Sequence, residues 1–173
     1  MKHDSYCSYC GEEFNALTYP LTCEECRNIT YNNPKPVVVL LVPVRMNAGP
    51  DGLLAIRRDN EPGRGELALP GGYLEVGETW QQGAARELME ETNQRVDPAS
   101  IRSIDVQTST ISSNLIIFGI SERILENELK SFVPNSEVSE IKMLLKPERL
   151  AFPLHNDMVE KFFKSKLGFP PVL

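Results

Sequence analysis

Three glutamates close together are the residues of this sequence that most directly suggest chemistry. Glu87, Glu90 and Glu91 fall on one stripe of a predicted helix, because spacings of three and four return to the same face. Like charges so close together repel, so helix stability gives no reason to gather them. A divalent cation does, because Mg²⁺ takes carboxylate oxygens and keeps other positions for water and substrate phosphates. The cluster therefore predicts a metal-dependent reaction on phosphate groups.

The residues around these glutamates support the same interpretation. Glu78 precedes the helix, where the helix dipole favours a carboxylate and where it can pair with Arg86. Gly71 and Gly72 allow close approach of the backbone, so that a main-chain carbonyl can join the metal ligands. The alternative is a solvated acidic helix after a glycine turn. The coincidence of glycines, spacings and arginine favours the metal site.

Four cysteines form a second group of potential metal ligands. Two Cys-x2-Cys pairs lie in the first 26 residues, and this pattern resembles a zinc ribbon; its members are Cys7, Cys10, Cys23 and Cys26. Four thiolates complete a tetrahedral zinc site and leave no position for water, so the expected Zn²⁺ is structural. The alternative is a redox pair, but two pairs without a βαβ context favour zinc. Thiols of this kind indicate a reducing compartment, and we expect a cytoplasmic protein.

Composition excludes several other classes of protein. The chain has 173 residues, 41% hydrophobic and 24% charged, which is typical of a soluble globular protein. The net charge of −6 argues against broad binding to nucleic acid. The longest apolar run, residues 37–44, is far shorter than the ~20 residues that a membrane-spanning helix needs. We therefore expect no membrane association and a small-molecule substrate.

The catalytic residues must be positioned by a β-rich body, predicted at residues 34–173 after a zinc ribbon at residues 1–33. Residues 37–45 read as one buried strand and residues 53–58 as the next, followed by a loop over 59–66. Thr79 and Gln82 fit a capping box, and Asn93 is a suitable helix stop because asparagine tolerates the left-handed conformation.

The pattern beyond this helix completes an α/β fold. We expect a strand hairpin at 101–112 and 114–124, a loop or short helical turn at 125–135, a strand at 140–145, a helical turn at 147–150 and a helix at 156–166. Strands that alternate with helices in this order indicate an α/β (α+β) sandwich around a mixed sheet.

The motif Gly72-x5-Glu78-x7-Arg86-Glu87-Leu88-x-Glu90-Glu91, preceded by Leu69-Pro70-Gly71, resembles the signature of the Nudix hydrolases. The resemblance implies an α/β/α Nudix sandwich and hydrolysis, dependent on Mg²⁺ or Mn²⁺, of a nucleoside diphosphate linked to another moiety. It further implies roles for residues of the motif. The implied metal ligands are Glu87, Glu90, Glu91 and the carbonyl of Gly72, with Arg86 and Glu78 orienting them.

The sequence departs from the family pattern at the end of the motif. The usual glycine is Asn93, and the usual apolar residue after it is Gln94. Asn93 can serve the same turn, so we expect no loss of metal binding.

Other residues have weaker claims to a role. Arg57 and Arg58 end a strand beside the site and could hold phosphate, or could simply be solvated. Some Nudix enzymes place an additional glutamate after the box, which leaves Glu137 and Glu140 as alternatives to the motif glutamates for activating water. His155 is expected to be structural.

The substrate stays open at this stage. A zinc ribbon before a Nudix domain resembles two branches, one of NADH pyrophosphatases and RNA-decapping enzymes, the other of FAD and ADP-ribose pyrophosphatases. The Ser-Gln-Pro-Trp-Pro-Phe-Pro array of the first branch is missing from residues 103–110. FAD, ADP-ribose and NADH are the expected candidates. The alternatives are a non-catalytic nucleotide-sensing regulator and a zinc-ribbon nucleic-acid-binding protein, and a homodimer is left open.

Overall fold

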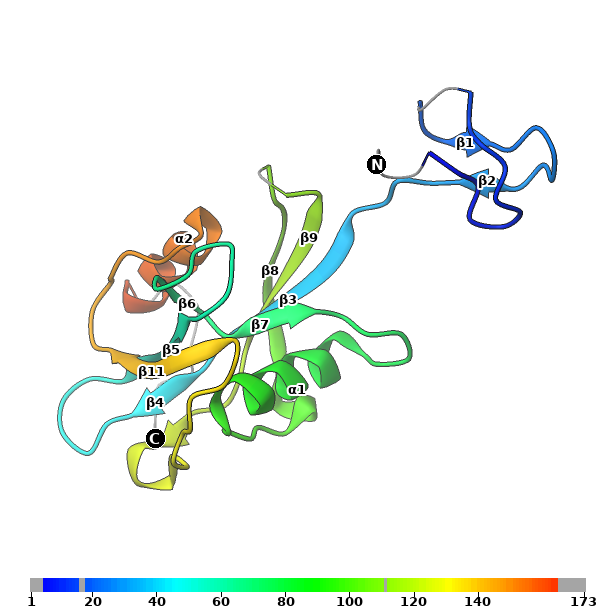
Figure 1. Ribbon diagram of the computed structural model, residues 1–173. Coiled ribbons are helices and arrows are strands. Elements are labelled where there is room, and N and C mark those ends of the chain that lie inside the picture. Colours follow the sequence, from blue (N-terminus) through cyan, green and yellow to red (C-terminus); the bar gives the residue numbers. More distant parts are fainter. Residues whose placement is uncertain (1–4, 16–17, 111, 165–173) are drawn as a thin grey trace. The chain divides into compact units, whose positions relative to one another are not determined.

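The computed structural model describes residues 5–15, 18–110 and 112–164 (Figure 1). The chain divides into two compact units, Met1–Pro34 and Lys35–Leu173. None of the helices in these described ranges is long and apolar enough to cross a membrane.

The first unit is built around one short hairpin. Strand β1 (Leu21–Thr22) pairs antiparallel with β2 (Ile29–Thr30), and Tyr6 forms an isolated antiparallel bridge with Glu13. Among its described residues, the buried apolar side chains are those of Cys7, Leu21 and Cys23. So small a core cannot hold a fold of this size by itself, and such units usually depend on a metal or on disulfides.

The first sheet of the second unit has the order β7-β3-β9-β8. At its centre β3 (Lys35–Leu41) runs parallel to β9 (Asn114–Ile120). The outer strands β7 (Gly71–Tyr73) and β8 (Arg102–Thr108) are antiparallel to their neighbours. The sheet is therefore mixed, as the sequence predicted.

A second sheet continues from the first along the same chain. Its order is β10-β4-β5-β11, with β6 paired to β5; its strands are β4 (Pro43–Arg45), β5 (Gly52–Arg58), β6 (Leu67–Ala68), β10 (Ile124–Leu125) and β11 (Val138–Leu144). Only the β10–β4 pair among these is parallel.

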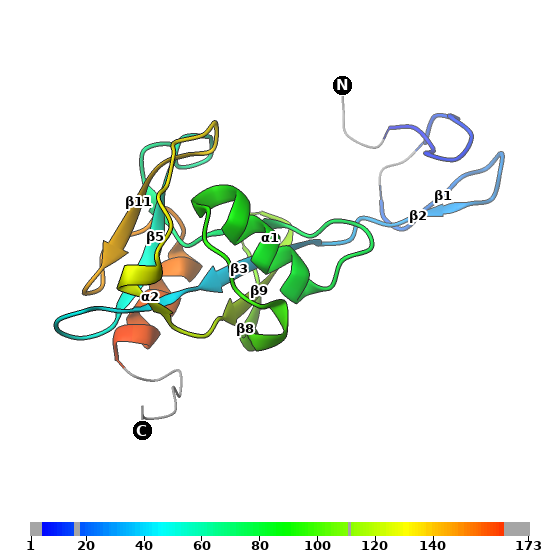
Figure 2. The same ribbon diagram turned by 90° about the horizontal axis from the view of Figure 1, so that it is seen from below.

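Two helices enclose the sheets, α1 (Trp80–Thr92) and α2 (Pro153–Phe163). Alternate side chains of β3 point to opposite faces, as in any strand. Val38 and Leu40 belong to the core cluster with Leu88 of α1. Val39 and Leu41 belong to the core cluster that contains Met158, Val159 and Phe162 of α2. The fold is thus the predicted α/β/α sandwich, and Figure 2 shows α1 and α2 on opposite sides of β3.

Several predicted bounds were wrong. Residues 37–45 are not one strand, because the chain leaves the first sheet after Leu41 and enters the second at Pro43. Residues 147–150 form no helical turn, and β11 begins at Val138 rather than at residue 140. Helix α2 begins at Pro153, three residues earlier than predicted, because proline suits the first helical position. Its predicted end, residue 166, lies outside the described residues.

The segments between the sheets and helices hold two short 3-10 helices. One covers Pro98–Ser100 and the other Glu126–Glu128, the latter inside the stretch predicted as a loop or short helical turn. The hairpin strands are shorter than predicted, ending at Thr108 and Ile120.

Candidate active site and cysteine cluster

Helix α1 carries the acidic motif, and its ends are fixed as the sequence predicted. The Thr79 amide donates to Gln82 Oε1 at 2.8 Å, and the Gln82 amide donates to Thr79 Oγ1 at 3.3 Å. This reciprocal pair is the expected capping box. At the other end Asn93 adopts the left-handed conformation, with φ of 60°. The helix therefore presents a fixed register of glutamates.

Arg86 binds several carboxylates on and beside the acidic face of α1, by which we mean the side of the helix that carries Glu87, Glu90 and Glu91. Its Nε and Nη2 donate to the two carboxylate oxygens of Glu78, at 3.1 and 2.8 Å. Its Nη1 donates to Glu87 at 2.8 Å and to Glu90 at 3.1 Å, and Nη2 also donates to the carbonyl of Tyr73 at 3.0 Å. These hydrogen bonds lower the pKa of Glu78 and raise that of Arg86. One guanidinium thus holds three carboxylates in place.

Glu91 is the most buried carboxylate of the motif, with only 4% of its surface exposed. Its Oε2 accepts a hydrogen bond from the Gly71 amide at 2.8 Å. Burial raises the pKa of Glu91 to about 8, against the lowering effect of that bond, and the charge of Glu87 raises it further. Burial also raises the pKa of Glu87. Glu87 and Glu91 are thus two neighbouring carboxyls with raised pKa values, and a bound cation would lower the pKa of both.

The two glycines of β7 make room for these carboxylates. Gly71 has a φ of +153°, and a side chain there would overlap the carbonyl of Val38. A β-carbon at Gly72 would overlap the carboxylate of Glu87. The bare backbone therefore lies directly against the acidic face of α1. Carboxylates and a main-chain carbonyl are the hard oxygen donors that Mg²⁺ takes, so the residues present fit this ion.

The carboxylate oxygens of Glu87, Glu90 and Glu91 do not lie close enough together in this structure to hold one metal ion between them. Among the described residues, only the four cysteines bring three or more potential ligand atoms of His, Cys, Asp or Glu close enough together to hold a metal ion. Glu87 and Glu90 are both bound by Arg86.

The two candidate glutamates beyond the motif, Glu137 and Glu140, occupy different surroundings. Glu140 forms an ion pair with Arg57 at 2.7 Å and lies across from it in the β11–β5 pairing. Glu137, by contrast, interacts electrostatically with the motif, because its charge raises the pKa of both Glu87 and Glu91.

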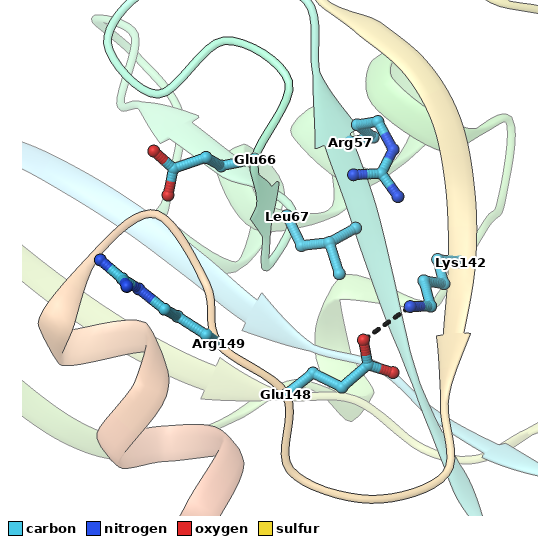
Figure 3. A pocket seen from close by; sticks show the side chains of 6 residues that line it. All are labelled: Arg57, Glu66, Leu67, Lys142, Glu148 and Arg149. Atoms are coloured by element: carbon cyan, nitrogen blue, oxygen red, sulfur yellow. Dashed lines mark hydrogen bonds and ion pairs between the residues drawn. The ribbon is translucent and has the colours of Figure 1, made fainter.

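Arg57 and Arg58, although adjacent in the sequence, bind different partners. Arg57 lines a pocket of about 500 Å³, shown in Figure 3, whose other lining residues are Glu66, Leu67, Lys142, Glu148 and Arg149. Arg58 donates to the carbonyl of Pro62 and to the side chain of Asn60, each at 2.8 Å, and lies over the ring of Phe152.

His155 is a core residue, as expected of a structural histidine. Its Nδ1 accepts a hydrogen bond from the Leu69 amide at 3.2 Å, and its ring packs edge-on against Phe118 and Phe152. Burial lowers the pKa of His155 to about 3, so the imidazole is neutral and holds the segment just before Gly71.

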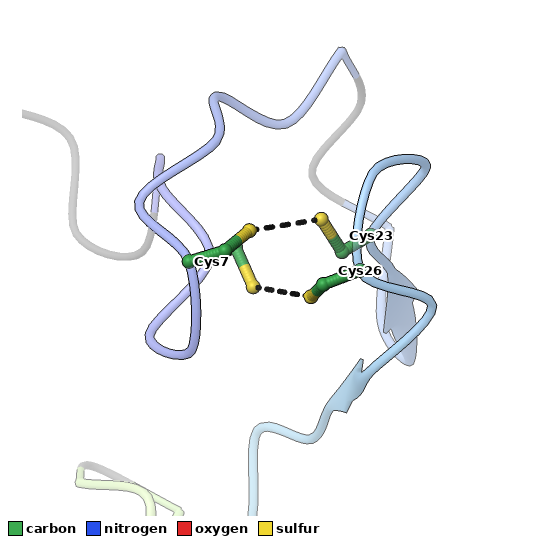
Figure 4. Close-up of side chains that lie close together, drawn as sticks. Cys7, Cys23 and Cys26 are labelled. Carbon is green, nitrogen blue, oxygen red and sulfur yellow. Dashed lines mark hydrogen bonds between the residues drawn. The ribbon is translucent and has the colours of Figure 1, made fainter.

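The four cysteines of the first unit converge, and all four sulfurs lie within 4.8 Å of one another. Cys7 and Cys26 are 3.6 Å apart, as are Cys10 and Cys23, so the close pairs join the two Cys-x2-Cys motifs (Figure 4). A tetrahedron with Zn–S bonds of about 2.3 Å has edges of about 3.8 Å, so the arrangement fits zinc. All four are free thiols, and hydrogen bonds from Asn28 lower the pKa of Cys26 to about 6.

Comparison with known proteins identifies the class to which this fold and site belong. The model of the NUDIX domain matches residues 34–164, which is most of the chain. The chain therefore belongs to the Nudix hydrolase family.

Particular relatives are similar over different shares of the chain. The NAD-capped RNA hydrolase NudC of Shigella flexneri is 32% identical over 93 residues, 53% of this chain and 34% of that protein. The match thus spans about a third of the length of the curated relative. A NUDIX hydrolase from Nitrosomonas europaea has a TM-score of 0.76 and 28% identity, covering 94% of this chain and 92% of that one. A bifunctional NMN adenylyltransferase/ADP ribose pyrophosphatase from Francisella tularensis has a TM-score of 0.52 and 25% identity, covering 65% and 34%.

Sequence reasoning missed three contributors to the site. The Gly71 amide and the Tyr73 carbonyl are main-chain groups, which no side-chain pattern reveals. Asn135, whose side chain donates to the Glu90 carbonyl at 3.1 Å, belongs to the segment predicted as a loop or short helical turn. The sole signal for it was an asparagine in a Pro-Asn-Ser turn sequence.

Proposed function

We propose that the second unit is a Mg²⁺-dependent (or Mn²⁺-dependent) hydrolase that cleaves the diphosphate bridge of a nucleoside diphosphate derivative. The observation that carries the proposal is Glu91, a carboxyl buried beside Glu87 against the bare backbone of Gly71 and Gly72. Two carboxyls so close together do not both ionise readily unless a cation is bound. Membership of the Nudix family supports the same chemistry.

Each residue of the site then has a defined task. Glu87, Glu90, Glu91 and the Gly72 carbonyl would hold the metal, which when bound neutralises charge on the diphosphate. Arg86, itself anchored by Glu78, fixes the directions of Glu87 and Glu90. The Gly71 amide fixes Glu91.

Glu137 is our choice as the base that accepts a proton from the attacking water. Its charge reaches Glu87 and Glu91, whereas the carboxylate of Glu140 is held by Arg57. A general base must lie within reach of the reacting water, and Glu137 meets this condition better. Arg57 and Arg58 are already bound to protein groups, so a role in holding phosphate would require them to exchange partners.

We propose a dinucleotide or a nucleotide sugar as the substrate, with FAD, ADP-ribose and NADH as the leading compounds. Two similar proteins are named for their action on NAD-capped RNA and on ADP-ribose, and both compounds contain a nucleoside linked through a diphosphate. The net charge of −6 disfavours a long RNA chain as the main contact. The complete set of motif glutamates favours an enzyme over a nucleotide-sensing regulator.

The first unit is, in our proposal, a zinc ribbon whose Zn²⁺ is structural. Its four thiol ligands would fill a tetrahedral shell and leave no place for a reacting water. Free cysteines arranged in this way also support a reducing compartment, for which we propose the cytoplasm. Whether two copies associate is best determined by measuring the mass in solution.

The decisive experiment measures product formation with Mg²⁺ and Mn²⁺ from FAD, NADH, NAD⁺, ADP-ribose, nucleoside triphosphates and NAD-capped RNA. We expect AMP from at least one compound and a loss of roughly 10³-fold or more in Glu91→Gln, since metal ligands carry much of the transition-state stabilisation. The matched control is Glu160→Gln, which changes an exposed glutamate of α2 that pairs with Lys164. Turnover that survives in Glu91→Gln would refute the site.

A further inference from the structure

The end of helix α1 departs from the Nudix pattern at Asn93 and Gln94, and the structure gives this departure a set of contacts. Gln94 is only 1% exposed, so its amide needs partners inside the protein. Its Nε2 donates to the carbonyl of Lys130 at 2.9 Å, and its Oε1 accepts from the Lys130 amide at 2.9 Å. Nε2 also donates to the Thr92 carbonyl at 3.0 Å. The Gln94 side chain therefore forms hydrogen bonds with both the amide and the carbonyl of Lys130, which is distant in the sequence.

Two further amides make the same kind of link. Asn93 Nδ2 donates to the carbonyl of Ser131 at 3.0 Å. Asn135 reaches in the other direction, and its Nδ2 donates to the Glu90 carbonyl at 3.1 Å. We call Asn93, Gln94 and Asn135 the amide clamp. Together they tie the segment 130–135 to the last turn of the helix that carries the acidic motif.

The clamp continues directly into the backbone of Glu137. The Asn135 Oδ1 accepts from the amides of Glu137 and Val138, at 2.9 and 2.8 Å. The Glu137 carbonyl accepts from the Asp59 amide at 2.7 Å. Glu137 is thus held on both sides of its α-carbon, and its charge acts on Glu87 and Glu91.

We propose that the amide clamp positions Glu137 against the acidic face of α1 and that hydrolysis depends on this placement. Gln94 is then a positioning residue, which acts through Glu137 and touches neither metal nor substrate. The proposal rests on the proposed function, since it assumes that Glu137 serves the hydrolysis. An apolar residue at position 94 could fill the same space, but it could not hold the Lys130 main chain.

The test is a double-mutant cycle of Gln94→Leu and Glu137→Gln, with kcat and KM measured for the best substrate. We expect Gln94→Leu to lower kcat by roughly 10- to 100-fold with little change in KM, because a misplacement of about 1 Å can cost that much. In the Glu137→Gln background the same change should have no further effect. Two effects that simply multiply would overturn the proposal. Gln107→Leu, which removes a glutamine side chain that donates to Asp105 on β8, is the matched control.

Hydrogen exchange gives a readout that needs no turnover. In Gln94→Leu the amides of residues 130–138 should exchange faster than in the wild-type protein and in Gln107→Leu, while those of β3 should not change. Unchanged exchange in residues 130–138 would overturn the clamp. If Glu137→Gln keeps wild-type kcat while Glu91→Gln is inactive, the positioning role fails and the hydrolase stands. If Glu91→Gln is also fully active, the proposed catalytic site fails as well.

Discussion

At the scale of single residues, Glu91 is the side chain whose placement is hardest to explain by stability alone. It is buried, receives one backbone hydrogen bond and lies beside a second carboxyl whose pKa is also raised. Its counterpart is Arg86, which binds Glu78, Glu87 and Glu90 but not Glu91. Arg86 thus pairs with three carboxylates, whereas the most buried carboxyl, Glu91, accepts a hydrogen bond from the Gly71 amide.

This arrangement predicts an unusual dependence of stability on pH when metal is absent. The pKa of Glu91 is about 8 in the folded protein and near the ordinary 4.5 when unfolded. The folded state therefore retains a proton that the unfolded state releases, so stability falls as the pH rises through this window. We expect the free energy of unfolding in EDTA to decrease between about pH 5 and about pH 8, as measured by urea denaturation.

The Glu91→Gln variant is the reference for this measurement, because it keeps the shape of the side chain and cannot ionise. Its stability should decline less than that of the wild type over the same range. Mg²⁺ should act in the opposite sense and stabilise the wild type more as the pH rises, because it binds the ionised form. Parallel declines in the two proteins would show that Glu91 is not the group responsible.

At the scale of elements, helix α1 is defined by local sequence at both ends. The capping box at Thr79 and the left-handed Asn93 fix which residues are helical, and hence which glutamates share a face. The neighbouring strand β7 supplies the Gly71 amide, the Gly72 backbone and the Tyr73 carbonyl. These main-chain groups and the motif glutamates therefore come from one strand and one helix that follow each other in the sequence.

Removal of the N-terminal cap tests the contribution of this element. We expect Thr79→Ala to lower the free energy of unfolding by about 1 kcal/mol, because one amide at the start of the helix loses its acceptor. Urea denaturation in the presence of saturating Mg²⁺ measures the change. Thr108→Ala, at the exposed end of β8, is the control and should differ from the wild type by less. Equal losses in the two variants would argue against the cap.

At the scale of the whole molecule, the two units differ in how many apolar side chains they bury. The second unit has extensive buried clusters on both faces of β3. The first unit buries few apolar side chains and brings four free thiols together instead. Structural zinc sites in zinc-finger peptides supply roughly 10–16 kcal/mol of apparent binding free energy, and we propose that Zn²⁺ stabilises the first unit in the same way.

Loss of one cysteine should therefore affect the two units unequally. We expect Cys23→Ser to abolish zinc binding and to make the first unit sensitive to protease, while the hydrolytic turnover of the second unit is largely retained. Metal content by mass spectrometry, limited proteolysis and thermal unfolding measure these effects. A zinc-free variant that melts at the wild-type temperature would contradict a structural role for the metal.

Much of this protein follows from its sequence because the informative interactions are local. The caps of α1, the common face of the glutamates and the pairing of Glu78 with Arg86 all join residues fewer than ten positions apart. Short-range geometry of this kind is encoded directly in the spacing of residue types. The family motif and the two cysteine pairs are readable for the same reason.

The tertiary structure alone decided what depends on contacts between distant segments. It divided residues 37–45 between two sheets at Val42, inside a run that the sequence shows only as continuously apolar. It paired Glu140 with Arg57 and brought Glu137 near the acidic face, although the two glutamates are three positions apart. It also gave Gln94 its partner 36 positions away. The sequence by itself determined which functional groups are available, and the pairing of remote strands and loops decided which of them lie together.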